Sequence, residues 1–225
     1  MKNLPDQSSS SLLPERSWPL TPLVELNSVS KSFGEQLVIK KASLRHEGGQ
    51  VLALTGPSGT GKSTILEILA GITAPDQGRV SLRGQATLMF QDNALIPWLN
   101  ALTNITYILK AETGSRPAKL TALNWLKTFK LDPWLYPGAM SSGMRRRLSL
   151  ARTLAANRPI ILLDEPFAFL DGLWHETIAK LIAAETERGS AIILTGHSLP
   201  EPFLRLLGGR LKEIIVTSPI VIEEA

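Results

Sequence analysis

Residues 51–63 constrain the fold of this 225-residue chain more than any other segment. The run Val-Leu-Ala-Leu-Thr at 51–55 is typical of a strand that is buried on both faces. Residues 56–63 match the pattern GxxxxGKS, and apolar residues at helical spacing follow from Ile65 to a predicted helix end at Gly71. A strand, a glycine-rich loop and a helix in this order predict an α/β domain with the loop at the end of a strand.

The glycine-rich loop, here called the P loop (residues 56–63), predicts a site for phosphate groups. Its glycines let main-chain N–H groups curl around phosphate oxygens, and the following helix adds partial positive charge at its first turn. Lys62 can reach the outer phosphates, and the Ser63 hydroxyl can ligate magnesium. A glycine-rich turn without a ligand is the alternative, which the flanking strand and helix disfavour. The predicted phosphate-binding residues are Gly56, Pro57, Ser58, Gly59, Thr60, Gly61, Lys62, Ser63 and Thr64.

A second apolar strand, at 160–163, ends in the adjacent carboxylates Asp164 and Glu165. The last residue of a strand enters a turn, so both groups can reach one crevice. Asp164 is predicted to hold magnesium through water, and Glu165 to orient and polarise the water that attacks in phosphoryl transfer. Two acids at a strand end are more often a helix cap or a solvated turn when they occur alone. Beside a phosphate-binding loop, the catalytic interpretation is favoured.

The remaining segments extend this α/β pattern. Apolar strands at 160–163 and 191–195 flank a predicted helix at 173–188, and this alternation implies a mainly parallel sheet. An N-terminal β region precedes it, with short strands predicted at 24–26, 37–39 and 42–44.

Two further regions are predicted outside the sheet. Residues from about 93 to 157 read as a helical subdomain, with apolar residues such as Leu123 and Leu126 at near-helical spacing. Residues 1–22, rich in serine and proline, are predicted to be a flexible arm and not a secretory signal. The domain would then extend over 23–225.

Composition excludes several classes of protein. The chain has no cysteine, which excludes disulfides and thiolate metal sites, and its content of 44% apolar and 20% charged residues is that of a globular protein. A net charge of +4 permits binding to nucleic acid or an anionic membrane, but the charges are dispersed and favour an ordinary solvated surface. No apolar run approaches the roughly 18 residues that would span a bilayer.

Five further short segments occur along the chain, and their order is informative together with that of the P loop and the acidic strand. They are Val-Ser-Lys-Ser-Phe-Gly at 29–34, Phe-Gln-Asp at 90–92, Met-Ser-Ser-Gly-Met followed by three arginines at 140–147, Ala-Phe-Leu-Asp at 168–171, and Thr-Gly-His-Ser at 195–198. Together with the P loop and the acidic strand, they resemble the motifs of ATP-binding-cassette (ABC) ATPases. The resemblance covers about residues 23–211, so the chain is identified as a member of that family.

The resemblance implies a role for one residue in four of these segments and for three residues in the segment 140–147. Phe33 would stack on adenine, Gln91 would sense magnesium and the attacking water, and His197 would contact the γ-phosphate. Residues 140–144, the signature turn, would bind the ATP of an opposite subunit through Ser141, Ser142 and Gly143, and Asp171 would communicate across the dimer. The implied ligands are ATP and Mg²⁺, with Ser63, Gln91 and Asp164 around the metal and Glu165, His197 and Gln91 as catalytic residues.

The signature turn departs from the family pattern LSGGQ. Ser142 replaces a glycine, which adds bulk where main chain approaches a ligand, and Met144 replaces a glutamine and so removes an amide. Weakened hydrolysis or a specialised partner is therefore one expectation. An ordinary helix capped by Ser141, with a basic face, is the alternative for this segment.

The function implied by the resemblance is that of the ATP-hydrolysing subunit of a membrane transporter. Residues 90–104 are most similar to bacterial importers for nitrate, sulfonates, taurine and related small solutes. The implied partners are a second cassette, transmembrane permease subunits that could dock on Trp98, and an extracytoplasmic solute-binding protein, at the cytoplasmic face of the inner membrane. Core packing is the alternative for Trp98. A soluble cassette ATPase acting on nucleic acid or ribosomes is the rival function, although no nucleic acid is expected, and a weakly hydrolysing regulatory cassette is another.

Overall fold

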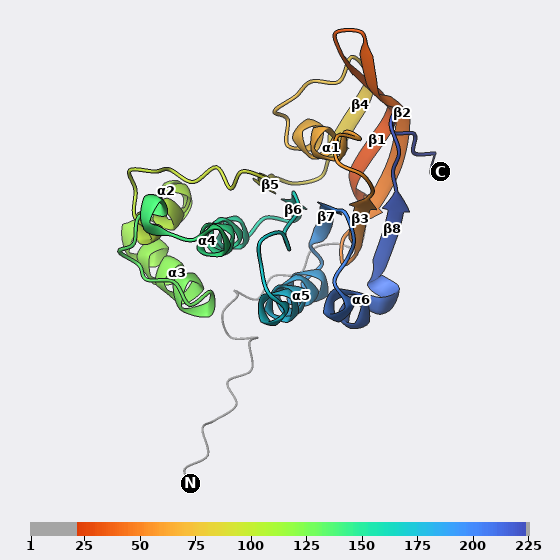
Figure 1. Ribbon diagram of the computed structural model, residues 1–225. Coiled ribbons are helices and arrows are strands. Elements are labelled where there is room, and N and C mark those ends of the chain that lie inside the picture. The colour runs from red at the N-terminus through yellow and green to blue at the C-terminus, as the bar shows by residue number, and fades with distance from the viewer. Residues whose placement is uncertain (1–21, 224–225) are drawn as a thin grey trace.

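The computed structural model describes residues 22–223, apart from the side chains of residues 22 and 111–113. The protein contains two sheets, a five-stranded parallel sheet and a three-stranded antiparallel sheet (Figure 1). The predicted fold class is confirmed: an α/β core with a parallel sheet, an N-terminal antiparallel β region and a group of helices.

The central strands of the parallel sheet are buried on both faces, whereas the edge strand next to the C-terminal segment is partly exposed. In spatial order, the strands of this sheet are β5 (Ala86–Met89), β6 (Ile160–Leu163), β7 (Ala191–Gly196), β3 (Val51–Thr55) and β8 (Leu211–Ile215). Alternate side chains of β3 belong to two separate apolar clusters, Val51 and Ala53 to one, Leu52 and Leu54 to the other. This alternation explains why the central strands read as continuous apolar runs in the sequence.

In the antiparallel sheet the long strand β1 (Pro22–Phe33) lies between the long strand β2 (Gln36–Glu47) and the shorter β4 (Gln77–Leu82). The separate strands predicted at 37–39 and 42–44 are wrong as boundaries, because both lie within β2. The exposed pair Lys40 and Lys41 interrupts the alternation of buried residues, and Lys41 adopts a left-handed φ of 49° where the pairing with β1 shifts register. A bulge of this kind absorbs the extra residue and lets one strand continue.

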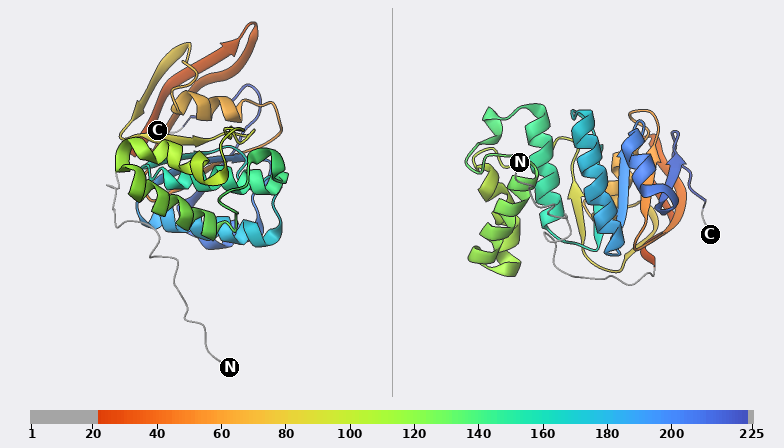
Figure 2. Two further views of the ribbon diagram at one scale, coloured as in Figure 1. Left: turned by 90° about the vertical axis from the view of Figure 1, so that its left-hand side faces the viewer. Right: turned by 90° about the horizontal axis from the view of Figure 1, so that it is seen from below.

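Helices cover the two faces of the parallel sheet and extend one end of the molecule. Helix α1 (Lys62–Leu69) packs between the two sheets, whereas α5 (Gly172–Glu187) and α6 (Glu201–Leu207) contribute to the apolar cluster on the opposite face. Figures 1 and 2 show α2 (Ala101–Thr113), α3 (Ser115–Thr128) and α4 (Ser142–Ala155) grouped at the end remote from the antiparallel sheet.

Two further predictions concern the ends and the helices of the chain. The flexible arm predicted over 1–22 lies outside the described residues, except for Pro22, which begins β1. Across the described part of the chain, the helices are too short or too polar to span a bilayer.

A C-terminal segment after β8 closes the fold beside the P loop. The main-chain N–H of Val216 donates to the carbonyl of Thr55 at 2.7 Å, and that of Ile220 donates to the carbonyl of Val38 at 2.8 Å. Ile220 and Ile222 are buried against β1 and β2. The segment therefore joins the end of β3, where the P loop begins, to the antiparallel sheet.

Candidate functional site

The P loop adopts a backbone that glycine alone accommodates at two positions. Gly56 has φ 142° and Gly61 has φ 100°, and a Cβ on Gly56 would lie 2.4 Å from the carbonyl oxygen of Val216. A Cβ on Gly61 would lie 2.3 Å from Cγ1 of Val38. The C-terminal segment and β2 thus pack closely against one side of the P loop. On the other side, the absence of side chains at the glycines lets main-chain groups approach a ligand closely.

Lys62, the first residue of α1, has a buried side chain that is folded into the P loop. Its Nζ donates to the carbonyl oxygens of Gly56 at 2.8 Å and Pro57 at 2.6 Å. Burial lowers the pKa of Lys62, while the carboxylates of Glu165 and Asp164 act in the opposite direction. The ammonium group therefore lies between the loop and the acidic end of β6, where a negatively charged ligand would offset its burial.

Thr195 of β7 joins the two carboxylate residues that follow β6. Its hydroxyl donates to Oδ1 of the buried Asp164 at 2.5 Å and accepts the main-chain N–H of Glu165 at 3.0 Å. Glu165 adopts a left-handed φ of 51°, which turns its side chain out of the strand direction. The two acids consequently have different surroundings: Asp164 is buried and bonded, whereas the Glu165 side chain is 19% exposed at the edge of the site.

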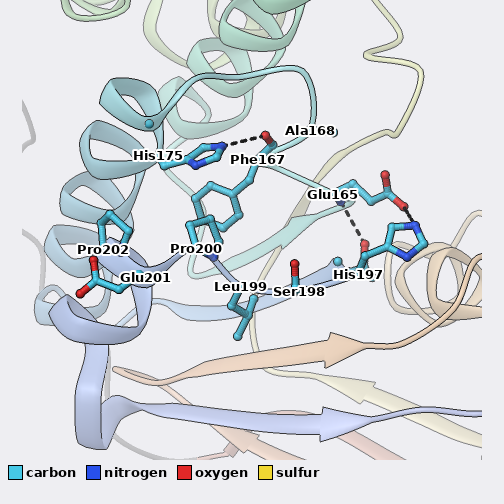
Figure 3. Close-up of a pocket in the computed structure, with 13 residues that line it drawn as sticks. Glu165, Phe167, Ala168, His175, His197, Ser198, Leu199, Pro200, Glu201 and Pro202 are labelled. Carbon is cyan, nitrogen blue, oxygen red and sulfur yellow. Dashed lines mark hydrogen bonds and ion pairs between the residues drawn. The ribbon is translucent and has the colours of Figure 1, made fainter.

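His197 lies between Glu165 and the P loop. Its Nε2 is 3.8 Å from Oε1 of Glu165 and 3.0 Å from the hydroxyl oxygen of Ser58. Figure 3 shows the imidazole facing the Glu165 carboxylate, with Phe167 and His175 on the far side of the same pocket. The structure thus brings three predicted site residues, Glu165, His197 and Ser58, into one chain of contacts.

The residues predicted around magnesium share one cleft. Ser63, Gln91 and Asp164 line an open cleft of about 660 Å³, which also contains Ser142. A hydroxyl, an amide oxygen and a carboxylate are hard oxygen donors, and Mg²⁺ is usually bound by one or two carboxylates together with phosphates and water. The donor set fits that ion. Within residues 22–223, no cluster of three or more His, Cys, Asp or Glu side chains offers a protein-only metal site.

The signature turn has the geometry of a capped helix start. Ser141 is the N-cap of α4, and its hydroxyl accepts the N–H of Met144 at 3.2 Å. A Cβ on Gly143 would lie 3.0 Å from the carbonyl oxygen of Phe169, so the turn packs closely against the loop that leads to Asp171. Asp171 caps α5 in the same way, by accepting the N–H of Trp174 at 3.2 Å. Ser141 and Asp171 are therefore both helix N-caps. Each side chain accepts one N–H group of the first turn, and other N–H groups of that turn can still bind a ligand.

Phe33 lies at the end of β1, opposite Gln36 in the hairpin with β2. Its side chain is 50% exposed, and the Nζ of Lys31 is 5.4 Å from the ring centroid. The same hairpin supplies Val38, which bounds the P loop at Gly61. An exposed aromatic ring on this hairpin is available to a planar ligand group.

Two residues with clear roles in the site geometry were not singled out from the sequence. Thr195 enters the sequence motif only as a neighbour of His197. A hydroxyl residue at the end of a buried strand needs a polar partner nearby, and this is the signal that could identify it. Arg146 was noted only as part of a basic run, yet its side chain is fully buried and bonded to the main chain of the acidic turn. Nothing in the local sequence separates Arg146 from the arginines on either side.

Comparisons with known proteins identify a matching family model and several relatives. A family model described as ABC transporter matches residues 39–168. The chain is 35% identical over 189 residues to the aliphatic sulfonates import ATP-binding protein SsuB of Granulibacter bethesdensis, covering 82% of this chain and 77% of that protein. It is 37% identical over 193 residues to the taurine import ATP-binding protein TauB of Pseudomonas aeruginosa, covering 77% of this chain and 72% of that protein.

A solved structure gives the same fold. The ATP-binding cassette MJ0796, a dimer in a post-hydrolysis state bound to ADP and Pi, superposes with a TM-score of 0.78 at 28% identity. The match covers 89% of this chain and 97% of that chain. Cassettes of this fold therefore form dimers.

Proposed function

The chain belongs to the ABC transporter family as an ATP-binding, ATP-hydrolysing subunit, and we propose that it powers a bacterial importer of small organic anions. The observation that carries the proposal is the run of contacts from Asp164 through Thr195 and Glu165 to His197 at the edge of the P loop. This run combines a buried acid, a partly buried base and an exposed histidine beside a phosphate-binding loop. Phosphoryl transfer to water uses an acid that holds the metal and a residue that orients the attacking water, and the run can supply both.

Each residue of the site has a part in the proposed hydrolysis. The P-loop N–H groups and Lys62 hold the phosphates of ATP, and Phe33 stacks on its adenine. Ser63, Asp164 and Gln91 would hold Mg²⁺, which would supply positive charge next to the outer phosphates. Glu165 orients the attacking water and accepts its proton, while His197 donates to the γ-phosphate.

The proposed working unit is a pair of cassettes. MJ0796, which shares this fold, is dimeric. In the proposed pair, Ser141, Ser142 and Gly143 of one chain bind the γ-phosphate held by the P loop of the other, and Asp171 communicates across the dimer. An identical chain is the simplest partner, because one chain carries both halves of such a composite site.

The proposed contact with the membrane is the segment that follows Gln91. Trp98 is 76% exposed, so the alternative that it packs in the core is wrong. Asn104 is fully buried and bonds the main chain of this segment at Ile96 and Leu99. An exposed tryptophan on the connection that also carries Gln91, with neighbouring main chain held by Asn104, suits an anchor for permease subunits at the cytoplasmic face of the inner membrane.

The proposed cargo class comes from relatives whose names specify sulfonate and taurine import. Selection of the cargo would rest with the permease and an extracytoplasmic solute-binding protein, because this chain supplies the ATP site. Transport of taurine or an alkanesulfonate by the assembled complex, dependent on Glu165, is the corresponding test.

The experiment for the motor function compares Mg²⁺-dependent ATP hydrolysis by the wild type and Glu165→Gln. Loss of a general base is expected to lower kcat by about 10²- to 10⁴-fold while ATP still binds, and ATP should then hold the variant as a dimer. Glu176→Gln is the matched control, because that carboxylate forms an exposed pair with Lys180 on α5. Equal kcat in the wild type and Glu165→Gln would refute the assigned base.

Stimulation distinguishes the remaining functions. Membranes that contain the permease should stimulate hydrolysis by the proposed motor, whereas nucleic acid should stimulate the soluble rival. Ser142 and Met144 specifically favour the regulatory alternative, because they alter the γ-phosphate contact. ATP binding without turnover, even with membranes, would establish that alternative.

A further inference from the structure

Arg146 is the largest side chain in the described part of the protein that is fully buried, with an exposed fraction of 0%. It lies in the first turn and a half of α4, close behind the signature turn. A guanidinium in the interior is costly unless its N–H groups are satisfied. Its partners therefore indicate what the buried charge does.

The guanidinium of Arg146 bonds the main chain of two separate loops. Its Nη1 donates to the carbonyl oxygens of Phe90 at 3.1 Å and Gln91 at 3.0 Å, in the loop after β5. Its Nη2 donates to the carbonyl of Asp164 at 2.6 Å and to that of Glu165, in the turn after β6. One rigid fork thus spans the predicted magnesium sensor and the catalytic carboxylate pair.

The electrostatic surroundings keep Arg146 charged. Burial lowers the pKa of Arg146 to about 10, and the carboxylates of Asp164, Glu165 and Asp92 limit the decrease. The group is therefore a cation at neutral pH, and its hydrogen bonds to carbonyl oxygens are charge-assisted.

Two more side chains on the same face of α4 hold the loop after β5. The Ser149 hydroxyl donates to the carbonyl of Asn93 at 3.0 Å, and Arg152 donates to the carbonyls of Asn93 at 2.9 Å and Ala94 at 2.8 Å. Asn93 and Ala94 both have left-handed φ angles, of 69° and 43°. The loop is thus fixed to α4 in an unusual backbone conformation, and it would follow a displacement of that helix.

Arg147 provides an internal comparison. Its Nη1 donates to the carbonyl of Phe129 at 2.6 Å, and its guanidinium carbon lies 4.4 Å from the ring centroid of Trp174. Both arginines bond main-chain carbonyls and both have a buried Nε without a partner. Only Arg146 reaches the loops that carry Gln91 and Glu165.

We propose that Arg146 is a positioning residue that couples the two ATP sites of a cassette pair, by fixing Glu165 and Gln91 of its own chain to the helix that begins with the signature turn. The inference rests on the proposed function, because the signature turn of α4 must face ATP bound by the partner. Docking of that ATP on Ser141–Gly143 would move or fix α4, and Arg146 would transmit this state to the catalytic turn of the other site. The coupling free energy then passes through a physical contact between two loops and one helix.

The test uses purified full-length chain carrying Arg146→Met, with Arg147→Met as the matched control. Arg146→Met is expected to lower kcat by about 10- to 100-fold, since small displacements of catalytic groups have effects of that size. Its affinity for ATP should remain within about threefold of the wild type, because the P loop is untouched. The Hill coefficient for ATP hydrolysis should decrease to about 1, whereas Arg147→Met should lower only the melting temperature.

Amide hydrogen exchange provides a second readout that does not depend on hydrolysis. The N–H groups of Glu165 and Ala168 are bonded to Thr195 and to the carbonyl of Glu165. Arg146→Met should accelerate exchange at 90–94 and 164–169, and Arg147→Met should not.

The outcomes separate the two proposals. A wild type that binds ATP without hydrolysing it would refute the proposed motor, while selective exchange at 90–94 and 164–169 in Arg146→Met would still support the positioning role. A cooperative wild type whose kcat and Hill coefficient survive Arg146→Met would overturn the coupling. Equal exchange in the two arginine variants would overturn the positioning role itself.

Discussion

Replacement of Thr195 by valine tests whether the acidic turn is held by the hydroxyl of β7. Valine keeps the shape of threonine but removes the donor to Asp164 (2.5 Å) and the acceptor of the Glu165 N–H (3.0 Å). Asp164 and Thr195 are both buried, so water replaces these bonds poorly. A hydrogen bond to a buried charged group is worth about 1.5–3 kcal/mol, and the orphaned N–H adds to the loss. We expect Thr195→Val to lower the free energy of unfolding by about 2–4 kcal/mol.

Urea unfolding at neutral pH measures this loss, and a chain of this size should show a decrease in Tm of about 2–4 °C for each kcal/mol. Thr195→Ser is the matched control: it keeps the hydroxyl, loses one methyl group and should cost about 1 kcal/mol. The hydrolysis rate should also fall in the valine variant and be largely retained in the serine variant. Equal destabilisation by valine and serine would show that packing, not the hydroxyl, holds the turn.

Three further predictions use other parts of the site and core. Burial lowers the pKa of His46 from 6.5 to about 4, so the unfolded chain takes up a proton at this histidine at a higher pH than the folded chain does. Protonation of His46 should therefore lower the free energy of unfolding by about 3 kcal/mol as the pH decreases from 6.5 to 4. His46→Gln should remove this part of the pH dependence of urea unfolding. Lys62→Ala should abolish tight ATP binding in equilibrium titration with little loss of Tm, and unchanged ATP affinity would contradict the P-loop assignment. Ser142→Gly combined with Met144→Gln should raise kcat for ATP hydrolysis, and an unchanged or lower kcat would show that the native signature turn is not a weakness.

The phosphate site was predictable because its signal is local. The strand at 51–55, the P loop and the start of α1 follow one another directly, and residue types there are dictated by close contacts such as Gly61 against Val38. The boundaries of β2 were not predictable, since Lys41 forms a bulge only because β1 pairs alongside. Strand β8 was missed because its exposed positions, including Lys212, give no continuous apolar run.

The link between α4 and the catalytic turn was hidden for a different physical reason. The acceptors of Arg146 are main-chain carbonyl oxygens, which every residue possesses. The sequence therefore shows which residue can donate but not which carbonyl oxygens accept. Three consecutive arginines cannot be distinguished until it is known which face of the helix each one occupies. Thr195 carries a clearer signal in the sequence, because it ends a predicted apolar strand and Asp164 directly follows another.

The unusual signature turn can be weighed against the geometry that surrounds it. Ser142 is exposed and lies in a normal helical first turn, and Ser141 still caps α4, so the main-chain donors of the turn are preserved. Met144 packs against the apolar cluster that includes residues of α2, α3 and α4. It lacks the amide that a glutamine would offer to a ligand. The two substitutions in the signature turn thus remove one side-chain donor and keep the main-chain donors. Arg146 on the same helix still donates a hydrogen bond to the carbonyl oxygen of Glu165. Such a chain should hydrolyse ATP more slowly than one with an intact LSGGQ turn, but with the two sites still coupled.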